Sequence, residues 1–358
     1  MNFEYQFRRL KDLDREELQE FMKELGEKPF HGRQIFAALH RRNIRSVDEM
    51  TDLPIKLRRK LHHYEPLDLV EPLSTRQAPD GTTKVLLGLR DGQRIESVWM
   101  PEDDYAVICL STQVGCPLEC TFCATGRLGF KRNLTAGEIV DQVAYFRREF
   151  PEVPLRNLVF MGMGEPLLNY DNLIKAVRIV SATDGAAVAQ RRITISTAGI
   201  APATRKLALE GLKVKLAVSL NAPTDELRSR IMPINRKYPL KELLEAVIEF
   251  QRIKKNKITF EYTLMPGVND TEEMIRSLRK LLLRVPSKLN LIPLNPLRKT
   301  RRPVADWDAV FNRFYRILAD DPITLTLRRS RGAEIQAACG QLAAQYRGVR
   351  TSKKRRES

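Results

Sequence analysis

Three of the five cysteines in this chain stand close together, at Cys116, Cys120 and Cys123. The spacing C-x3-C-x2-C is typical of loops that hold three irons of a [4Fe-4S] cluster, because thiolates are the ligands that such clusters require. The fourth iron then stays open and can bind the amino and carboxyl groups of S-adenosylmethionine (SAM). Radical chemistry is therefore possible at this loop.

A zinc site is the alternative interpretation of the same cysteines. Structural zinc usually takes four ligands, often as paired C-x2-C motifs. The histidines that could complete such a site all lie far upstream of the cysteines, at His31, His40, His62 and His63. We therefore favour the iron–sulfur cluster and keep zinc as the alternative.

The chain is strongly basic, with 61 Lys and Arg residues against 44 Asp and Glu, which gives a net charge of +17. Such an excess favours binding to polyanions, and nucleic acid is the first candidate. The positive charge is gathered in short patches at residues 41–42, 56–60, 298–302, 328–331 and 353–356. The alternative is that these patches are only the solvated surface of a basic enzyme.

Nothing in the sequence predicts a membrane protein. Hydrophobic residues make up 43% of the chain, and the apolar runs are far shorter than the ~20 residues that a spanning helix needs. The chain opens on a charged segment rather than on a signal peptide. Its five cysteines suit a reducing compartment. We therefore expect a cytoplasmic protein without a membrane contact.

The sequence divides into four expected regions. They are a helical accessory domain over residues 1–75, a β-hairpin linker over 76–105, a main α/β domain over 106–335, and a C-terminal segment with a basic tail over 336–358. The helices of the first region are expected around residues 15–25 and 32–42, with another opened by Pro54, because apolar positions recur there at helical spacing.

The hairpin is predicted from two apolar segments, 84–89 and 94–100, that flank Asp91-Gly92. This dipeptide is the favoured pair for a two-residue type I′ turn. The hairpin leads directly into the cysteine region.

From residue 106 onward, apolar segments alternate with helical ones. The predicted strands are 106–110, 158–161, 193–196, 214–219, 258–263 and 289–293, with a last one at 323–327. Parallel strands with crossover helices are the expected result. Six units are too few for a closed eight-unit barrel, so we predict a partial (β/α)6 barrel. A doubly wound sheet stays open as an alternative, because periodicity alone does not separate the two.

Glycines and polar residues recur where the predicted strands end. Gly164 and Glu165 follow the second strand, and Glu165 offers a carboxylate to an ammonium group such as SAM carries. The later strands end at Ser196, at Ser219-Leu220-Asn221 and at Asn295. A polar cofactor lying across the mouth of a barrel needs such groups. Taken singly, each of them could instead belong to a turn or cap a helix.

The two remaining cysteines are Cys109 and Cys339. Cys109 lies on an apolar strand and could be a small core residue, whereas Cys339 is flanked by small residues that leave its thiol reachable. No histidine follows His63, so a base in the main domain must be a carboxylate or a thiolate. Glu96 is our candidate for that base, and the alternative is an ordinary polar position on the hairpin.

These motifs together resemble the radical SAM adenine-C2 methyltransferases, which modify 23S ribosomal RNA (rRNA) and, in some members, transfer RNA (tRNA). The resemblance covers nearly the whole chain. The matching segments include Gly26-Glu27-Lys28-Pro29-Phe30, Ile95-Glu96-Ser97-Val98, Cys123-Ala124-Thr125-Gly126, Gly164-Glu165-Pro166-Leu167, Asn295-Pro296 and Ala337-Ala338-Cys339-Gly340-Gln341-Leu342. One segment departs from the family's pattern, because residues 297–303 are more basic than the Pro-Gly loop expected there.

The resemblance implies a role for each candidate residue. Cys116, Cys120 and Cys123 would hold the cluster, and SAM would be held by Gly164, Glu165, Ser196, Ser219, Leu220, Asn221 and Asn295. Cys339 would carry the methyl group and Cys109 would resolve the adduct through a transient disulfide. Glu96 would accept a proton.

The resemblance also implies a fold, cofactors and partners. It implies a partial radical SAM barrel with an N-terminal RNA-binding accessory domain, a [4Fe-4S] cluster and SAM as cofactors, and 23S rRNA, with tRNA as a possible second substrate. An electron donor such as flavodoxin or ferredoxin would reduce the cluster. The nearest alternative is methylation at carbon 8 of adenosine by the same mechanism. An alternative from another class is a zinc RNA-binding protein without catalysis.

Overall fold

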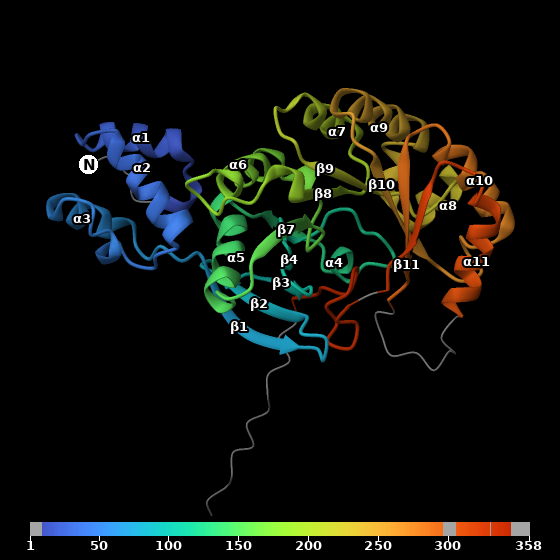
Figure 1. Ribbon diagram of the computed structural model, residues 1–358, viewed down its shortest axis with the longest axis horizontal. Helices are drawn as coiled ribbons and strands as arrows, with labels where there is room; N and C mark the ends of the chain where they lie inside the picture. The colour runs from blue at the N-terminus through green and yellow to red at the C-terminus, as the bar shows by residue number, and fades with distance from the viewer. Residues whose placement is uncertain (1–8, 296–305, 330, 345–358) are drawn as a thin grey trace, which may run out of the picture.

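The parallel strands of the main domain lie in one sheet in the order in which they occur along the chain. The computed structural model describes residues 9–295, 306–329 and 331–344, and its ten-stranded sheet has the order β1-β2-β3-β4-β7-β8-β9-β10-β11-β12 (Figure 1). The parallel strands are β4 (Ala106–Cys109), β7 (Leu155–Phe160), β8 (Ile193–Thr197), β9 (Lys215–Ser219), β10 (Ile258–Leu264), β11 (Ser287–Pro293) and β12 (Thr324–Leu327).

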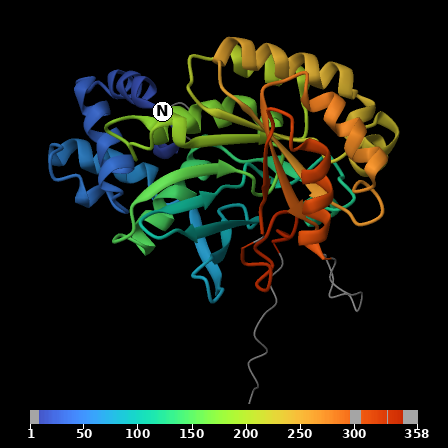
Figure 2. The ribbon, with the colours of Figure 1, turned by 45° about the vertical axis from the view of Figure 1, so that its right-hand side comes forward.

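This strand order decides between the two architectures predicted from the sequence. A doubly wound sheet reverses its strand order at a switch point, and no reversal occurs between β4 and β12 among the described residues. Right-handed crossovers then place the connecting helices on one face. Figures 1 and 2 show these helices along the outer side of the curved sheet. The partial barrel is therefore confirmed.

Each parallel strand is connected to the next through a helical segment. These helices are α5 (Ala136–Glu149), α6 (Tyr170–Ser181), α7 (Ala201–Leu209), α8 (Asp225–Ile231), α9 (Leu240–Lys254), α10 (Glu272–Leu282) and α11 (Trp307–Leu318). Helix α5 begins with the capping box that its sequence carries, in which Thr135 accepts from the backbone of Glu138 and the Glu138 side chain accepts from the backbone of Thr135.

The hairpin forms with a different turn from the one predicted. Strands β2 (Thr83–Leu89) and β3 (Arg94–Pro101) pair antiparallel, but Leu89 N bonds Gln93 O at 2.8 Å, so three residues form the loop instead of two. Gly92 takes the left-handed conformation, with φ of 80°, as three-residue hairpin loops require. A further strand, β1 (Val70–Gln77), pairs with β2 and was not predicted.

The N-terminal region is helical up to residue 64. Its helices are α1 (Arg15–Glu24), α2 (Phe30–Ala37) and α3 (Ile55–Leu61), joined by shorter turns. A Cβ atom at Gly32 would lie 2.5 Å from the backbone N of Gln19, so glycine allows the close crossing of α1 and α2. Strand β1 includes residue 75, where the accessory domain was expected to end. The boundary at residue 75 stays a prediction.

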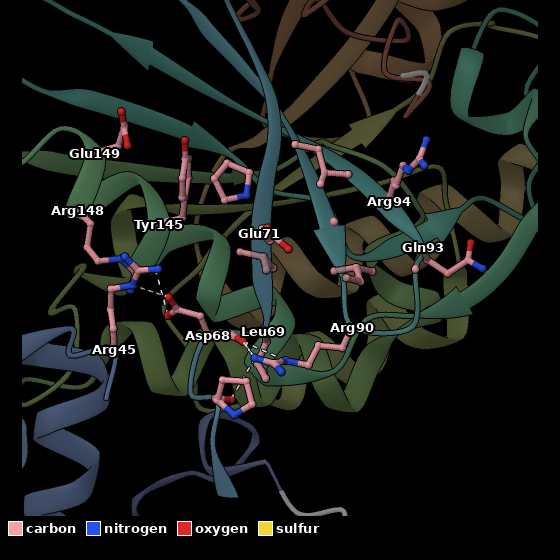
Figure 3. A pocket seen from close by; sticks show the side chains of 17 residues that line it. Arg45, Asp68, Leu69, Glu71, Arg90, Gln93, Arg94, Tyr145, Arg148 and Glu149 are labelled. Atoms are coloured by element: carbon pink, nitrogen blue, oxygen red, sulfur yellow. Dashed lines mark hydrogen bonds and ion pairs between the residues drawn. The ribbon is translucent and has the colours of Figure 1, made fainter. Parts of the chain in front are cut away.

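Buried charges attach the N-terminal helices to the barrel. The ammonium of Lys11 pairs with Asp141 on α5, and both side chains are almost fully buried. Asp68 joins two elements as well, because Arg45 Nε lies 2.9 Å and Arg148 Nη2 lies 3.2 Å from its carboxylate (Figure 3). Removal of one partner from a buried pair costs about 3–5 kcal/mol, so the two parts are firmly joined. Within the described residues, none of the helices is both long and apolar enough to cross a lipid bilayer.

Candidate active site

The cysteine loop is fixed by backbone contacts on both sides. It follows β5 (Gln113–Gly115), which pairs with β6 (Phe130–Asn133). A Cβ atom at Gly115 would lie 1.8 Å from Gly129 O, so only glycine fits there. Cys116 N donates to Gly129 O at 3.1 Å, and Thr121 N donates to Ile231 O at 3.0 Å. The thiols are therefore held by a preformed loop.

The three thiols line one cavity at the carboxyl ends of the parallel strands. The other predicted residues on its wall are Gly164, Glu165, Ser196, Ser219, Asn221, Asn295 and Cys339. The side chain of Leu220 is fully buried, and its backbone N donates to Glu261 O at 3.0 Å. Leu220 is therefore the predicted SAM-binding residue that does not line this cavity.

The donor set fits a cluster. Burial raises the pKa of Cys116 to about 12 and also raises the pKa of Cys120, so buried thiolates here need a compensating cation, and coordination supplies one. Among residues 9–295, 306–329 and 331–344, no three His, Cys, Asp or Glu side chains stand close enough to share one metal ion. The three cysteines line one cavity, and thiolates are the ligands that an iron–sulfur cluster requires.

Glu165 is held in place by backbone donors. Its carboxylate accepts from Leu167 N at 3.1 Å and from Ala198 N at 2.7 Å. Burial raises its pKa to about 7. Gly164 before it has φ of 100°, and a Cβ atom there would lie 2.5 Å from the side chain of Gln113. The Gly-Glu pair therefore presents an oriented carboxylate beside the cysteine loop.

The polar strand ends come from different strands and meet at the cavity. Ser196 lies on β8 and Ser219 on β9, while Asn221 and Asn295 follow β9 and β11. Asn221 takes the left-handed conformation, with φ of 57°, and its Oδ1 accepts from Thr263 N at 2.8 Å. Asn295 Nδ2 donates to Cys339 O at 3.2 Å. The cavity therefore offers several hydrogen-bonding groups to a polar ligand.

Cys109 and Cys339 face a second cavity that adjoins the first. Both line it, and Cys339 lines the first cavity as well. All five cysteines are free thiols. Burial raises the pKa of Cys109 to about 12, and desolvation by the surrounding atoms raises the pKa of Cys339 although part of that residue is exposed. The two thiols share one space.

Sequence reasoning missed Arg328 as a residue of this site. Its guanidinium lines the second cavity, and Nη1 lies 3.9 Å from the sulfur of Met161. Its positive charge lowers the pKa of both thiols, against the larger effect of burial. The sequence signal was present, but it was interpreted only as part of a basic patch at residues 328–331.

Arg328→Met should shift the alkylation of Cys339 to higher pH. The guanidinium favours the charged thiolate, so its loss raises the pKa and leaves less of the reactive species at neutral pH. The rate of Cys339 alkylation at pH 7.5, measured by peptide mass spectrometry, should fall by up to roughly tenfold, which is the effect of one pKa unit. Arg276→Met is the control, because that guanidinium pairs with Glu272 on α10 and is 66% exposed. An equal fall in both variants would contradict the assignment.

Glu261 was also missed. It lies on β10 and lines the first cavity with only 5% of its surface exposed. Asn290 Nδ2 donates to its Oε1 at 3.1 Å, while its buried Oε2 lacks a hydrogen-bond partner among the described residues. Burial raises its pKa. The cavity wall therefore contains a second carboxylate besides Glu165.

Glu96 lies on β3, outside both cavities. Its carboxylate pairs with Lys84 at 3.0 Å and accepts from Ala343 N at 2.8 Å. The structure therefore brings Glu96 to the segment that carries Cys339 without bringing it to the thiols. The basic loop at residues 297–303 lies outside the described residues.

The chain matches two protein-family models and is similar to several known proteins over most of its length. The model of the radical SAM superfamily matches residues 110–281, and the model of the ribosomal RNA large subunit methyltransferase N-terminal domain matches residues 9–65. The dual-specificity RNA methyltransferase RlmN of Geobacter sulfurreducens is 47% identical over 96% of this chain and 94% of its own length. The chain belongs to the RlmN family. The RlmN of Syntrophobacter fumaroxidans is 45% identical over 94% of this chain and 98% of its own.

A solved structure supports RlmN membership. A radical SAM methyltransferase from Sphaerobacter thermophilus is 43% identical and superposes with a TM-score of 0.89, covering 94% of this chain and 99% of that one. The family resemblance inferred from the motifs is thus confirmed. Radical SAM enzymes use a [4Fe-4S] cluster and SAM, so these expected cofactors are confirmed with it.

Proposed function

We propose that this RlmN-family chain methylates carbon 2 of an adenosine in 23S rRNA and in tRNA, with the methyl group carried on Cys339. The observation that carries the proposal is the position of Cys339. It lines the cavity of Cys116, Cys120 and Cys123 and also the adjoining cavity of Cys109. The relatives in this family are named dual-specificity RNA methyltransferases.

The reaction needs a radical route. Carbon 2 of adenine is electron-poor and has no lone pair, so it cannot attack the methyl of SAM as a thiolate can. Bound to the three cysteines, the cluster would supply with SAM the one-electron chemistry that activates a C–H bond. The SAM itself would lie against Gly164, Glu165, Ser196, Ser219, Asn221 and Asn295. Leu220 would act only by holding the strand end between Ser219 and Asn221, because its backbone N and O bond Glu261 O and Arg228 Nε.

The two further cysteines would divide the transfer between them. Cys339 is nucleophilic as a thiolate and would take a methyl group from SAM, with the Arg328 guanidinium favouring that thiolate. Once the carbon of this group is bonded to adenine, the Cys109 thiolate would attack the sulfur of Cys339 and form a disulfide. The electron pair of the carbon–sulfur bond would go to the carbon, which takes a proton and becomes the methyl group. An external dithiol would then reduce the disulfide.

The proton acceptor, the reductant and the RNA-binding surface are proposed from the family resemblance and from the positive charge of the chain. The resemblance implies that Glu96 would accept the proton that leaves carbon 2, whereas its carboxylate lies outside both cavities in the structure. A flavodoxin or ferredoxin would reduce the cluster. A protein that modifies rRNA would act in the bacterial cytoplasm. The N-terminal helices would hold RNA, because Arg33, Arg41 and Arg42 are exposed and line a common hollow on that domain.

The double variant Arg33→Gln with Arg41→Gln should bind RNA more weakly and with less salt dependence. Each phosphate contact contributes about 0.7 to 0.9 to the slope of log K against log salt, so the slope should fall by about 1.4 to 1.8. Filter binding from 50 to 300 mM KCl measures it. Lys241→Gln with Lys280→Gln is the matched control, because it removes two exposed charges from the outer helices of the barrel. The same slope in both double variants would contradict an RNA interface on the N-terminal helices.

Nucleoside analysis tests the proposed function. The reconstituted protein is incubated anaerobically with 23S rRNA or tRNA, SAM and a reductant, and the RNA is digested for mass spectrometry. We expect 2-methyladenosine from both RNAs and about four irons per chain. The appearance of 8-methyladenosine would instead show that the protein methylates carbon 8. A colourless zinc protein without product would refute enzymatic function.

A further inference from the structure

The segment that carries Cys339 contains neither a helix nor a strand over residues 331–344. Figure 1 shows it between the β2–β3 hairpin and helix α4 (Ala124–Arg127). Its position therefore depends on contacts that other elements make with it, since it has no regular structure of its own. Those contacts lie on two sides.

On one side, a buried ion pair holds the segment before and after Cys339. Lys84 Nζ donates to Gln336 O at 3.0 Å, and the backbone N of Ala343 donates to Glu96 Oε2 at 2.8 Å. Lys84 Nζ and Glu96 Oε1 lie 3.0 Å apart, with 7% and 5% of the two side chains exposed. Glu96 pairs in register with Leu86, so Lys84, two residues earlier, points to the same face of the hairpin.

On the other side, the segment is held by residues that directly follow the cysteine loop. The backbone N of Ala124 donates to Gly340 O at 2.7 Å, and Thr125 Oγ1 donates to Leu342 O at 2.7 Å. Ala124 is the residue after Cys123. The segment therefore bridges the hairpin and the cysteine loop, and Cys339 lies between its two anchors.

We infer that the Lys84–Glu96 ion pair is a latch that holds the Cys339 segment closed over the cavity, and that Lys84 is a positioning residue for the methyl carrier. The inference rests on the proposed role of Cys339 and adds a residue to it. Both charges are satisfied by each other and by the backbone of this one segment. Loss of Lys84 removes the donor to Gln336 O and leaves Glu96 without its counter-charge, so both anchors on the hairpin side weaken.

Hydrogen exchange in the reconstituted full-length protein tests the latch. In Lys84→Met, the peptide covering residues 331–344 should exchange its amides at least about tenfold faster, since a lost buried anchor costs more than 1.4 kcal/mol. In the same variant, the rate at which iodoacetamide alkylates Cys339 should differ from the wild-type rate. The methylation of Cys339 should fall severalfold. Iron content and reductive SAM cleavage should stay at wild-type levels. Lys84→Arg should restore the wild-type exchange, because it keeps the charge and the donors.

A second variant tests the latch if Lys84→Met does not fold. Lys84→Met with Glu96→Leu removes both charges, and apolar replacement of a buried pair is often tolerated. Exchange in residues 331–344 should be faster there too. Unchanged exchange and alkylation in a folded variant would overturn the latch. Because neither measurement depends on turnover, absence of RNA methylation in the wild-type protein would refute the proposed function and leave this result standing.

Discussion

Cys339→Ala should abolish RNA methylation while iron content and reductive SAM cleavage stay at wild-type levels. Cys116, Cys120 and Cys123 precede it by more than 200 residues. The segment's contacts with Ala124 and Thr125 use the backbone carbonyls of Gly340 and Leu342, which the substitution does not alter. A covalent carrier has no substitute, so the rate should fall by at least about a thousandfold. Transfer of labelled methyl from SAM to RNA measures the rate, and the production of 5′-deoxyadenosine measures SAM cleavage.

The matched control for this variant is Cys109→Ala, which removes the other thiol of the shared cavity. Cys339→Ala should leave no covalent link to RNA, whereas Cys109→Ala should trap one. Substantial methylation by Cys339→Ala would contradict a carrier role. Loss of iron in the same variant would instead mean that Cys339 acts on the cluster.

Cys109→Ala should accumulate as a covalent adduct between Cys339 and RNA. Methyl uptake and carbon–carbon bond formation do not use the sulfur of Cys109, and only release does. The adduct should appear on a denaturing gel as a nuclease-sensitive shift of nearly all the active protein after one turnover. Adding Cys339→Ala to the variant should abolish the shift.

A purely structural Cys109 predicts a different outcome. Its side chain is buried at the end of β4, so alanine would leave a small cavity and lower stability by roughly 1 kcal/mol. Turnover would continue. Free methylated RNA without an adduct would therefore refute the resolving role, and thermal unfolding of the variant separates this case from a folding defect.

The fold could be predicted because local patterns determine most of it. The predicted strands at residues 193–196 and 258–263 correspond to β8 and β10, since apolar runs between helical segments specify buried parallel strands. Strand β1 was missed because seven of its eight residues are exposed, which leaves no alternating pattern. The turn at Gly92 was assigned one residue too few, since Asp-Gly fits both loop lengths.

The candidate site was predictable wherever a motif is contiguous in sequence. The cysteine loop and the Gly164-Glu165 pair are of this kind, and their roles stay predictions that the geometry supports. Lys84 could not be assigned, because it acts on a segment that only the fold brings near it. Lys84 lies 252 residues from Gln336, whose carbonyl it binds, and no local pattern encodes that contact.

The origin of the methyl carbon tests the central claim most directly. Protein methylated on Cys339 with SAM carrying a ¹³C-methyl group is separated from that SAM and then given RNA, reductant and unlabelled SAM for one turnover. We predict ¹³C in the methyl group of the first 2-methyladenosine and loss of the label from the Cys339 peptide, both read by mass spectrometry. An unlabelled first product, with ¹³C still on Cys339, would contradict transfer through this cysteine.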